Sequence, residues 1–203
     1  MIQYLIVCPL VFVAGLVDSI AGGGGLIALP AYLIAGVPAH MALGTNKMSS
    51  AMGTVVSTAR FARNGYLRGK MLMAACSAAA ALIGSAFGAH LALMVSEEII
   101  KHMMIVVLPI VAFYVLRNKD MGENEKTGTI PQVKVFAICI AAAFFIGGYD
   151  GFYGPGTGTF LILILTGAAR LDTRSASAQT KVINLSSNIA ALVTFIATGN
   201  VFY

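Results

Sequence analysis

The stretch GLVDSIAGGGGLIALP, residues 15–30, decides the fold of this chain. Four consecutive glycines interrupt an apolar segment after its only acid, Asp18, and a lone lysine, Lys47, follows them. Each glycine costs a helix about 1 kcal/mol relative to alanine, so four in a row are expected to end it. We therefore expect one helix to stop at this break and a second helix to begin near Leu26.

The same pattern occurs a second time, in the stretch GGYDGFYGPGTG at residues 147–158. Asp150 lies in this stretch and Lys181 follows it, so each break lies between one acid and one lysine. The glycines of a single run could serve only to let two helices cross closely, but the duplication argues against that interpretation. Duplicated helix breaks with ionisable neighbours, in an apolar chain, are typical of membrane carriers.

The composition indicates a membrane protein. Hydrophobic residues make up 58% of the 203 residues and charged residues only 10%, and the mean hydropathy of +0.86 is too high for a soluble surface. A helix needs about 20 predominantly apolar residues to cross the hydrocarbon core. The sequence therefore predicts an all-α, polytopic integral membrane protein. Five segments are expected to span the membrane: 2–17, 71–95, 99–116, 131–149 and 177–197. Two shorter segments, 26–36 and 159–169, are expected to be half-helices or tilted spans.

The charged and sulfur-containing residues exclude several other classes of protein. The net charge of +5 lies mostly in loops, where it acts as a topology signal and not as a nucleic-acid patch. Cys8, Cys76 and Cys139 are scattered singly, and the ten methionines lack the clustered spacing of a copper or haem site. Neither glycine run continues into the lysine and hydroxyl residue of a nucleotide-binding loop. We expect no metal, no cofactor and no nucleic acid.

The repeat divides the chain into two halves. An offset of 132 residues maps Asp18 on Asp150, and after a two-residue insertion an offset of 134 maps Lys47 on Lys181. The second half has no counterparts of the last two apolar segments of the first, so we expect the chain to be a fragment of a longer protein. The predicted domains are a first transmembrane repeat at 1–116, a polar linker at 117–131 and a second transmembrane repeat at 132–203.

Loop charges predict how the halves are oriented. In the first half, basic residues follow the lysine segment, and the loop before it, 36–39, has none. In the second half, Arg170 and Arg174 precede the lysine segment instead. Under the positive-inside rule, equivalent loops would lie on opposite sides of the membrane, as in inverted repeats. The basic residues that follow the lysine segment of the first half are Arg60, Arg63, Arg68 and Lys70.

Lys47 and Lys181 are the main candidates for a binding site. Each is a lone cation among small, apolar and hydroxyl residues, and a charge at membrane depth costs at least about 2.5 kcal/mol. The free N–H groups where each helix restarts also favour an anion. We expect a small anion to bind between the two ammonium groups, at the facing breaks. The predicted substrate-binding residues are Gly23, Gly24, Gly25, Thr45, Asn46, Lys47, Gly156, Thr157, Gly158, Thr180, Lys181 and Asn184.

The same residues also allow other interpretations. Lys47 would pair with Asp18 and Lys181 with Asp150, or each lysine would extend to the membrane interface. The two aspartates would carry protons for coupling or cap the broken helices. Rival functions are an intramembrane aspartyl protease that uses Asp18 and Asp150, and a passive channel or scaffold. Between these classes we expect a transporter and not an enzyme.

The motifs around both breaks resemble the sulfite exporter TauE/SafE family of membrane permeases. The resemblance rests on residues 15–30, ALGTNK at 42–47 and NGY at 64–66, and on 147–158 and TKVIN at 180–184. It implies a multi-pass permease of the bacterial inner (cell) membrane, whose partners are the lipid bilayer and a small anionic substrate. Sulfite, sulfonates and related organic anions are the implied substrates. We expect transport by alternating access, linked to the proton gradient.

Overall fold

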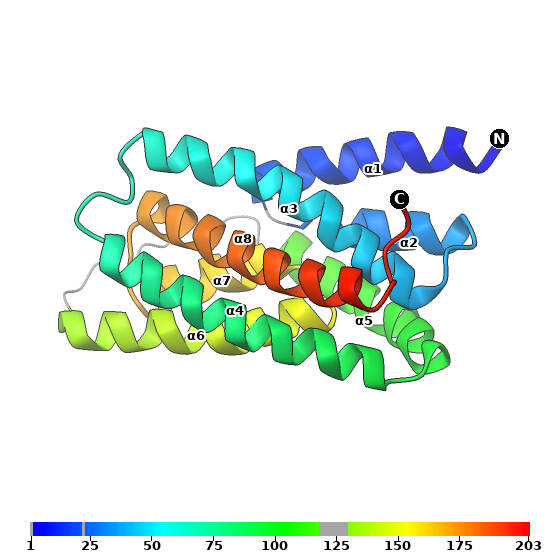
Figure 1. Ribbon diagram of the computed structural model, residues 1–203. Helices are drawn as coiled ribbons and strands as arrows, with labels where there is room; N and C mark the ends of the chain where they lie inside the picture. The colour runs from blue at the N-terminus through cyan, green and yellow to red at the C-terminus, as the bar shows by residue number, and fades with distance from the viewer. Residues whose placement is uncertain (1, 22, 118–129) are drawn as a thin grey trace.

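The computed structural model describes residues 2–21, 23–117 and 130–203, which fold into eight α-helices without a strand (Figure 1). Gly22 of the first break and residues 118–129 of the predicted linker lie outside this part of the chain. The all-helical fold predicted from the sequence is confirmed. The helices are α1 (Ile2–Ala21), α2 (Gly25–Ile34), α3 (Ala39–Arg63), α4 (Met71–Met94), α5 (Glu97–Arg117), α6 (Gln132–Phe152), α7 (Thr157–Gly167) and α8 (Thr173–Ala197).

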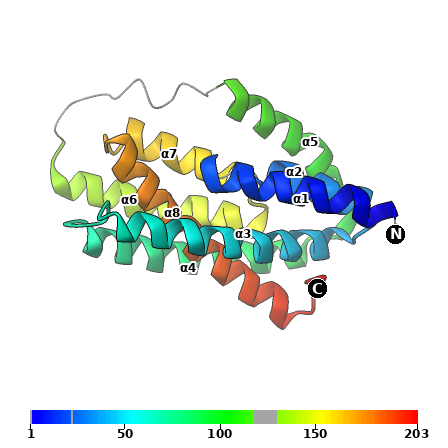
Figure 2. The same cartoon turned by 90° about the horizontal axis from the view of Figure 1, so that it is seen from above.

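Two groups of three helices share one pattern: a long helix, a glycine break, a short helix and a second long helix. Helices α1, α2 and α3 have 20, 10 and 25 residues, and α6, α7 and α8 have 21, 11 and 25. Figures 1 and 2 show that α1 and α3 run in the direction opposite to α6 and α8. The equivalent long helices of the two groups are therefore antiparallel.

The distribution of polarity is that of a protein surrounded by lipid. Within the described residues, α4, α5, α6 and α8 are long and apolar enough to cross a membrane. Phe87, Val133 and Phe145 point outward and are 62%, 79% and 71% exposed, whereas Lys47 and Asp150 are 1% and 2% exposed. Apolar side chains outside and ionisable groups inside suit a bilayer, because charges in membrane proteins face the interior of the bundle. The predicted polytopic membrane fold is confirmed.

Glycines allow α4 and α6 to cross closely. A Cβ atom at Gly84 of α4 would collide with the backbone oxygen of Phe144, and one at Gly151 of α6 with the backbone oxygen of Ser85. Small residues let two backbones approach where the lipid supplies no hydrophobic force between helices. This crossing holds the end of α6, and with it the second glycine break, against α4.

The loops that carry basic residues meet at one end of the molecule. Lys70, between α3 and α4, donates a hydrogen bond of 2.6 Å to Ser175 Oγ and lies 3.6 Å from Asp172 Oδ2. Asp172 caps α8 by accepting the Ser175 N–H at 2.9 Å. Burial disfavours its ionised form, but the Ser175 hydrogen bonds and the Lys70 ammonium outweigh this and lower the pKa of Asp172 below its ordinary value of 3.8.

Candidate functional site

Each glycine break is held by the aspartate that precedes it. At the first break, the Asp18 carboxylate accepts the Gly24 N–H at 3.2 Å. At the second, the Asp150 carboxylate accepts the Thr157 hydroxyl at 2.9 Å, and Gly154 and Gly156 have φ angles of 99° and 80° that favour glycine. The short helices α2 and α7 begin directly after these contacts, so their first N–H groups remain inside the protein.

The two breaks meet in the interior. A Cβ atom at Gly25, the first residue of α2, would lie 3.7 Å from Pro155 Cα in the turn before α7, and 3.2 Å from Asn46 Nδ2. The N-termini of two short helices therefore converge, one from each half of the chain, beside α3. Helix N-termini carry partial positive charge, so this meeting point favours negatively charged groups.

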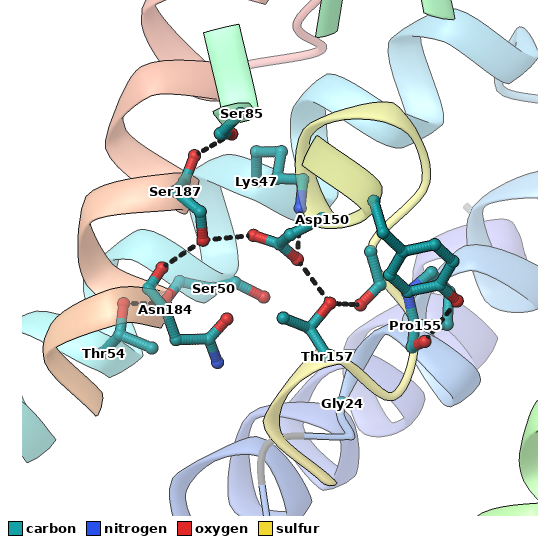
Figure 3. A network of polar contacts seen from close by, with 12 residues as sticks. Gly24, Lys47, Ser50, Thr54, Ser85, Asp150, Pro155, Thr157, Asn184 and Ser187 are labelled. Atoms are coloured by element: carbon teal, nitrogen blue, oxygen red, sulfur yellow. Dashed lines mark hydrogen bonds and ion pairs between the residues drawn. The ribbon is translucent and has the colours of Figure 1, made fainter. Parts of the chain in front are cut away.

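Lys47 of α3 pairs with the aspartate of the other half. Its Nζ lies 2.8 Å from Asp150 Oδ1, and this pair is almost completely buried (Figure 3). The second carboxylate oxygen of Asp150 accepts the Ser187 hydroxyl at 2.6 Å. The alternative pairing of Lys47 with Asp18, considered from the sequence, is therefore wrong, because α3 lies beside the second break as well as the first.

Lys181 of α8 also contacts the other half of the chain, but its partner is a backbone oxygen and not a carboxylate. Its Nζ donates a hydrogen bond of 2.9 Å to the backbone oxygen of Asp18, and the residue is 5% exposed. The alternatives in which Lys181 pairs with Asp150 or extends to the interface are thus also wrong. Among the described residues, no carboxylate lies within ion-pair distance of the Lys181 ammonium.

A small polar cavity of about 10 Å³ lies where the breaks meet, which is room for about one water molecule. Asn46, Asn184 and Asn188 line it, and in the part of the chain that the structure describes their side-chain amides make no hydrogen bond. Buried amides without partners are uncommon, so the cavity offers unused donors and acceptors. Its lining residues are Asp18, Gly25, Asn46, Lys47, Ser50, Asp150, Gly154, Thr157, Asn184 and Asn188.

A second cavity, of about 20 Å³, shares part of its lining with the first. Asp18, Asn46 and Ser50 line both cavities, and Gly24 and Gly53 belong to the lining of the second one. The structure therefore brings seven of the residues singled out from the sequence into one lining, together with Gly24 in the next. The seven are Asp18, Gly25, Asn46, Lys47, Asp150, Thr157 and Asn184.

Other residues predicted for the site lie behind this lining. Thr45 donates to the Met41 backbone oxygen at 2.6 Å and accepts the Phe202 N–H at 2.9 Å, and it borders a larger apolar cavity of about 420 Å³. Thr180 is buried, and its hydroxyl has no partner within the described chain. The remaining residues outside the two linings are Gly23, Gly156, Gly158 and Lys181.

Sequence reasoning missed three residues that line the central cavity and one, Ser187, that donates to Asp150 beside it. Ser50 lies three positions after Lys47 on α3, and Ser187 and Asn188 lie three and four positions after Asn184 on α8. Residues three or four apart share a helix face, so this spacing could have found Ser50 and Asn188 in the lining and Ser187 on Asp150. Gly154 belongs to the quoted motif, and a Cβ atom there would lie 2.7 Å from Lys47 Nζ.

The family model described as sulfite exporter TauE/SafE matches residues 7–203. The chain belongs to this family. The probable membrane transporter protein ORF9 of Sinorhizobium sp is 38% identical over 194 residues, which cover 95% of this chain and 72% of that protein. A probable membrane transporter protein of Haemophilus influenzae is 32% identical over 192 residues, which cover 95% of this chain and 73% of that protein. The probable membrane transporter protein YfcA of Escherichia coli strain K12 is 31% identical over 208 aligned residues, which cover 100% of this chain and 75% of that protein.

Family membership confirms the resemblance found in the sequence motifs and agrees with the arrangement of the helices. The chain is a multi-pass membrane protein of a transporter family, whose relatives carry the name of membrane transporter. A transporter of this kind handles a small molecule within the membrane. No solved structure matches the chain.

Proposed function

We propose that this protein is a permease for small anions, with sulfite, sulfonates or related organic anions as substrates, in the bacterial inner membrane. The anionic class is supported by the converging N-termini of α2 and α7 and by the two buried lysines, Lys47 and Lys181. Sulfite itself is suggested by the description of the family. One observation carries the proposal: helix breaks from both halves of the chain meet at a single buried polar cavity.

The anion would bind in this cavity. Lys181, which lies behind the lining of the cavity, is the cation with the freer charge, because the carboxylate of Asp150 already pairs with Lys47. The amides of Asn46, Asn184 and Asn188 would donate hydrogen bonds, as would the N–H groups at the starts of α2 and α7. These donors would replace part of the hydration shell that an anion loses on entering the protein.

The size of the cavity supports alternating access. A sulfite ion is larger than the single water molecule that about 10 Å³ accommodates, so the helices around the cavity must separate to admit it. The two groups of helices, with antiparallel equivalents, are suited to rock about the site as inverted repeats of 1–116 and 132–203 joined by the linker 117–131. The end that carries Lys70 and Arg174 would face the cytoplasm under the positive-inside rule.

The geometry argues against an aspartyl protease built on Asp18 and Asp150. Catalytic aspartate pairs share a proton between two adjacent carboxyl groups. Here Lys47 and Thr157 contact one oxygen of Asp150 and Ser187 contacts the other, so this carboxylate is committed to other partners. A passive channel or scaffold is the remaining rival, and flux kinetics separate both from a carrier.

Uptake of radiolabelled sulfite into proteoliposomes tests the proposed function. We expect saturable uptake that an unlabelled alkyl sulfonate inhibits, and exchange of external for internal label when both sides hold substrate. Uptake that rises linearly with concentration would instead support a channel. Cleavage of a membrane peptide that is lost in both Asp18→Asn and Asp150→Asn, without anion uptake, would support the protease.

A further inference from the structure

The two aspartates at the breaks occupy equivalent positions, but their surroundings differ. Three side chains contact the Asp150 carboxylate: Lys47 at 2.8 Å, Thr157 at 2.9 Å and Ser187 at 2.6 Å. Within the described chain, one hydrogen bond reaches the Asp18 carboxylate, from the Gly24 N–H at 3.2 Å. Both aspartates are buried, with exposed fractions of 8% for Asp18 and 2% for Asp150. Asp18 is therefore the carboxylate with unused hydrogen-bonding capacity.

The sequence explains this difference. The offset of 132 residues that maps Asp18 on Asp150 maps Gly25 on Thr157, and the offset of 134 maps Gly53 on Ser187. Glycines thus stand in the first half where the second half has the two hydroxyl groups that donate to its aspartate. A hydroxyl donor stabilises an ionised carboxylate, so the first half lacks two stabilising donors that contact Asp150 in the second half.

Open space takes the place of the missing hydroxyl of Ser187. Gly53 and Asp18 line the same cavity of about 20 Å³, and a Cβ atom at Gly53 would meet no atom within 4 Å. A cavity of this size has room for a water molecule, and Asp18, Asn46 and Ser50 would supply polar partners for it. Water beside a buried carboxylate provides a route by which a proton reaches or leaves it.

The charges around Asp18 link its ionisation to anion binding. The ionisable groups that surround it are Lys181 from α8, Lys47 from α3 and Asp150 from α6. Lys47 and Asp150 cancel each other, and Lys181 contacts the backbone oxygen of Asp18 and not its carboxylate. With Asp18 ionised, the four groups carry no net charge and an anion gains little. With Asp18 protonated, the charge of Lys181 is uncompensated and attracts an anion.

We infer that Asp18 is the carboxyl group that takes up and releases the coupling proton, while Asp150 remains paired with Lys47. One proton passes from water in the adjacent cavity to a carboxylate oxygen of Asp18 as the anion binds, and returns to water on the other side as the anion leaves. Because each ligand favours binding of the other, proton and anion move in the same direction. This inference rests on the proposed function and names its coupling group.

The test uses proteoliposomes and radiolabelled methanesulfonate, an anion whose charge does not change around neutral pH. Two quantities are measured: exchange of label at equal pH, and accumulation driven by a pH gradient that is acidic on the outside. We expect wild type to show both. Asp18→Asn, which imitates the protonated acid, should lose accumulation, and the exchange that it performs should no longer depend on pH. Accumulation in Asp18→Asn equal to that of wild type would overturn the inference while leaving the proposed function intact.

Two variants at Gly53 keep the test decisive if Asp18→Asn folds poorly. Gly53→Ser supplies the hydroxyl that Ser187 gives to Asp150, so protonation of Asp18 should require more acidic conditions. The dependence of its accumulation on external pH should shift to lower pH. Gly53→Ala adds bulk without a donor and should keep the pH dependence of wild type. Unshifted or equally shifted profiles for these two variants would contradict the inference. Absence of exchange in wild type would instead overturn the proposed function for this anion.

Discussion

At the second break, two glycines with positive φ form a tight turn, and three side chains hold Asp150. At the first break, Gly24 at the start of α2 has an ordinary φ of −57°, and its N–H contacts Asp18. The same sequence pattern thus produces a fixed anchor in one half and a less constrained carboxylate in the other. Duplicated motifs can keep their position in a fold while their chemical roles diverge, because neighbouring residues decide the partners.

The two lysines also differ in the kind of partner that they contact. Lys47 forms an ion pair with a carboxylate, whereas Lys181 donates to a backbone oxygen. Removing one partner of a buried ion pair leaves an uncompensated charge, which costs more than an unpaired carbonyl oxygen. Substitutions at equivalent positions of the two halves should therefore have unequal effects.

The largest difference is expected between Lys47→Ala and Lys181→Ala. Lys47→Ala leaves the Asp150 carboxylate buried without its cation and should lower the free energy of unfolding by about 3–5 kcal/mol. Lys181→Ala should cost about 1–3 kcal/mol. Denaturant unfolding in detergent measures both, and adding Asp150→Ala to Lys47→Ala should recover part of the loss. Equal losses for the two lysines, or no recovery in the double variant, would refute the asymmetry.

An intermediate difference is expected between Gly154→Ala and Gly23→Ala. Gly154 has a φ of 99°, and a Cβ atom there would lie 2.7 Å from Lys47 Nζ and disturb the ion pair. A residue with a side chain in this backbone region costs about 1–2 kcal/mol before that disturbance. At Gly23 the nearest atom is Leu26 Cδ1 at 3.8 Å, an ordinary contact. Thermal unfolding should therefore separate the two alanine variants, and a neutral Gly154→Ala would show that the second turn is not constrained.

The smallest effect is expected where the long helices begin. Asp172 caps α8 through the Ser175 N–H, whereas Pro38 before α3 provides no side-chain cap. Asp172→Ala should cost about 1 kcal/mol. Since the pKa of Asp172 is lowered in the folded state, this contribution is present above the ordinary value of 3.8 and is lost as the pH falls through the folded value. The free energies of unfolding of wild type and Asp172→Ala, measured at neutral and acidic pH, test this direction. The difference between the two proteins should become smaller in acid.

The sequence predicted the helices well because apolar length and glycine runs are local signals. It could not predict that Lys47 pairs with Asp150, because this contact depends on how α3 and the end of α6 pack in three dimensions. The placement of Thr45 has a simpler cause. Thr45 lies two residues before Lys47, and residues two apart point to different helix faces, so Thr45 faces away from the cavity. Ser50 lies three residues after Lys47, so it shares the helix face of Lys47 and lines the cavity.

The measurement that tests the central claim most directly is equilibrium binding of radiolabelled sulfite to the purified protein, in wild type, Lys181→Ala and Lys134→Ala. Lys134 is an exposed lysine at the start of α6 and serves as a control for the loss of one positive charge. If the anion binds where the two breaks meet, wild type and Lys134→Ala should bind equally and Lys181→Ala should lose binding. Unchanged binding in Lys181→Ala would place the anion elsewhere in the molecule and contradict the account.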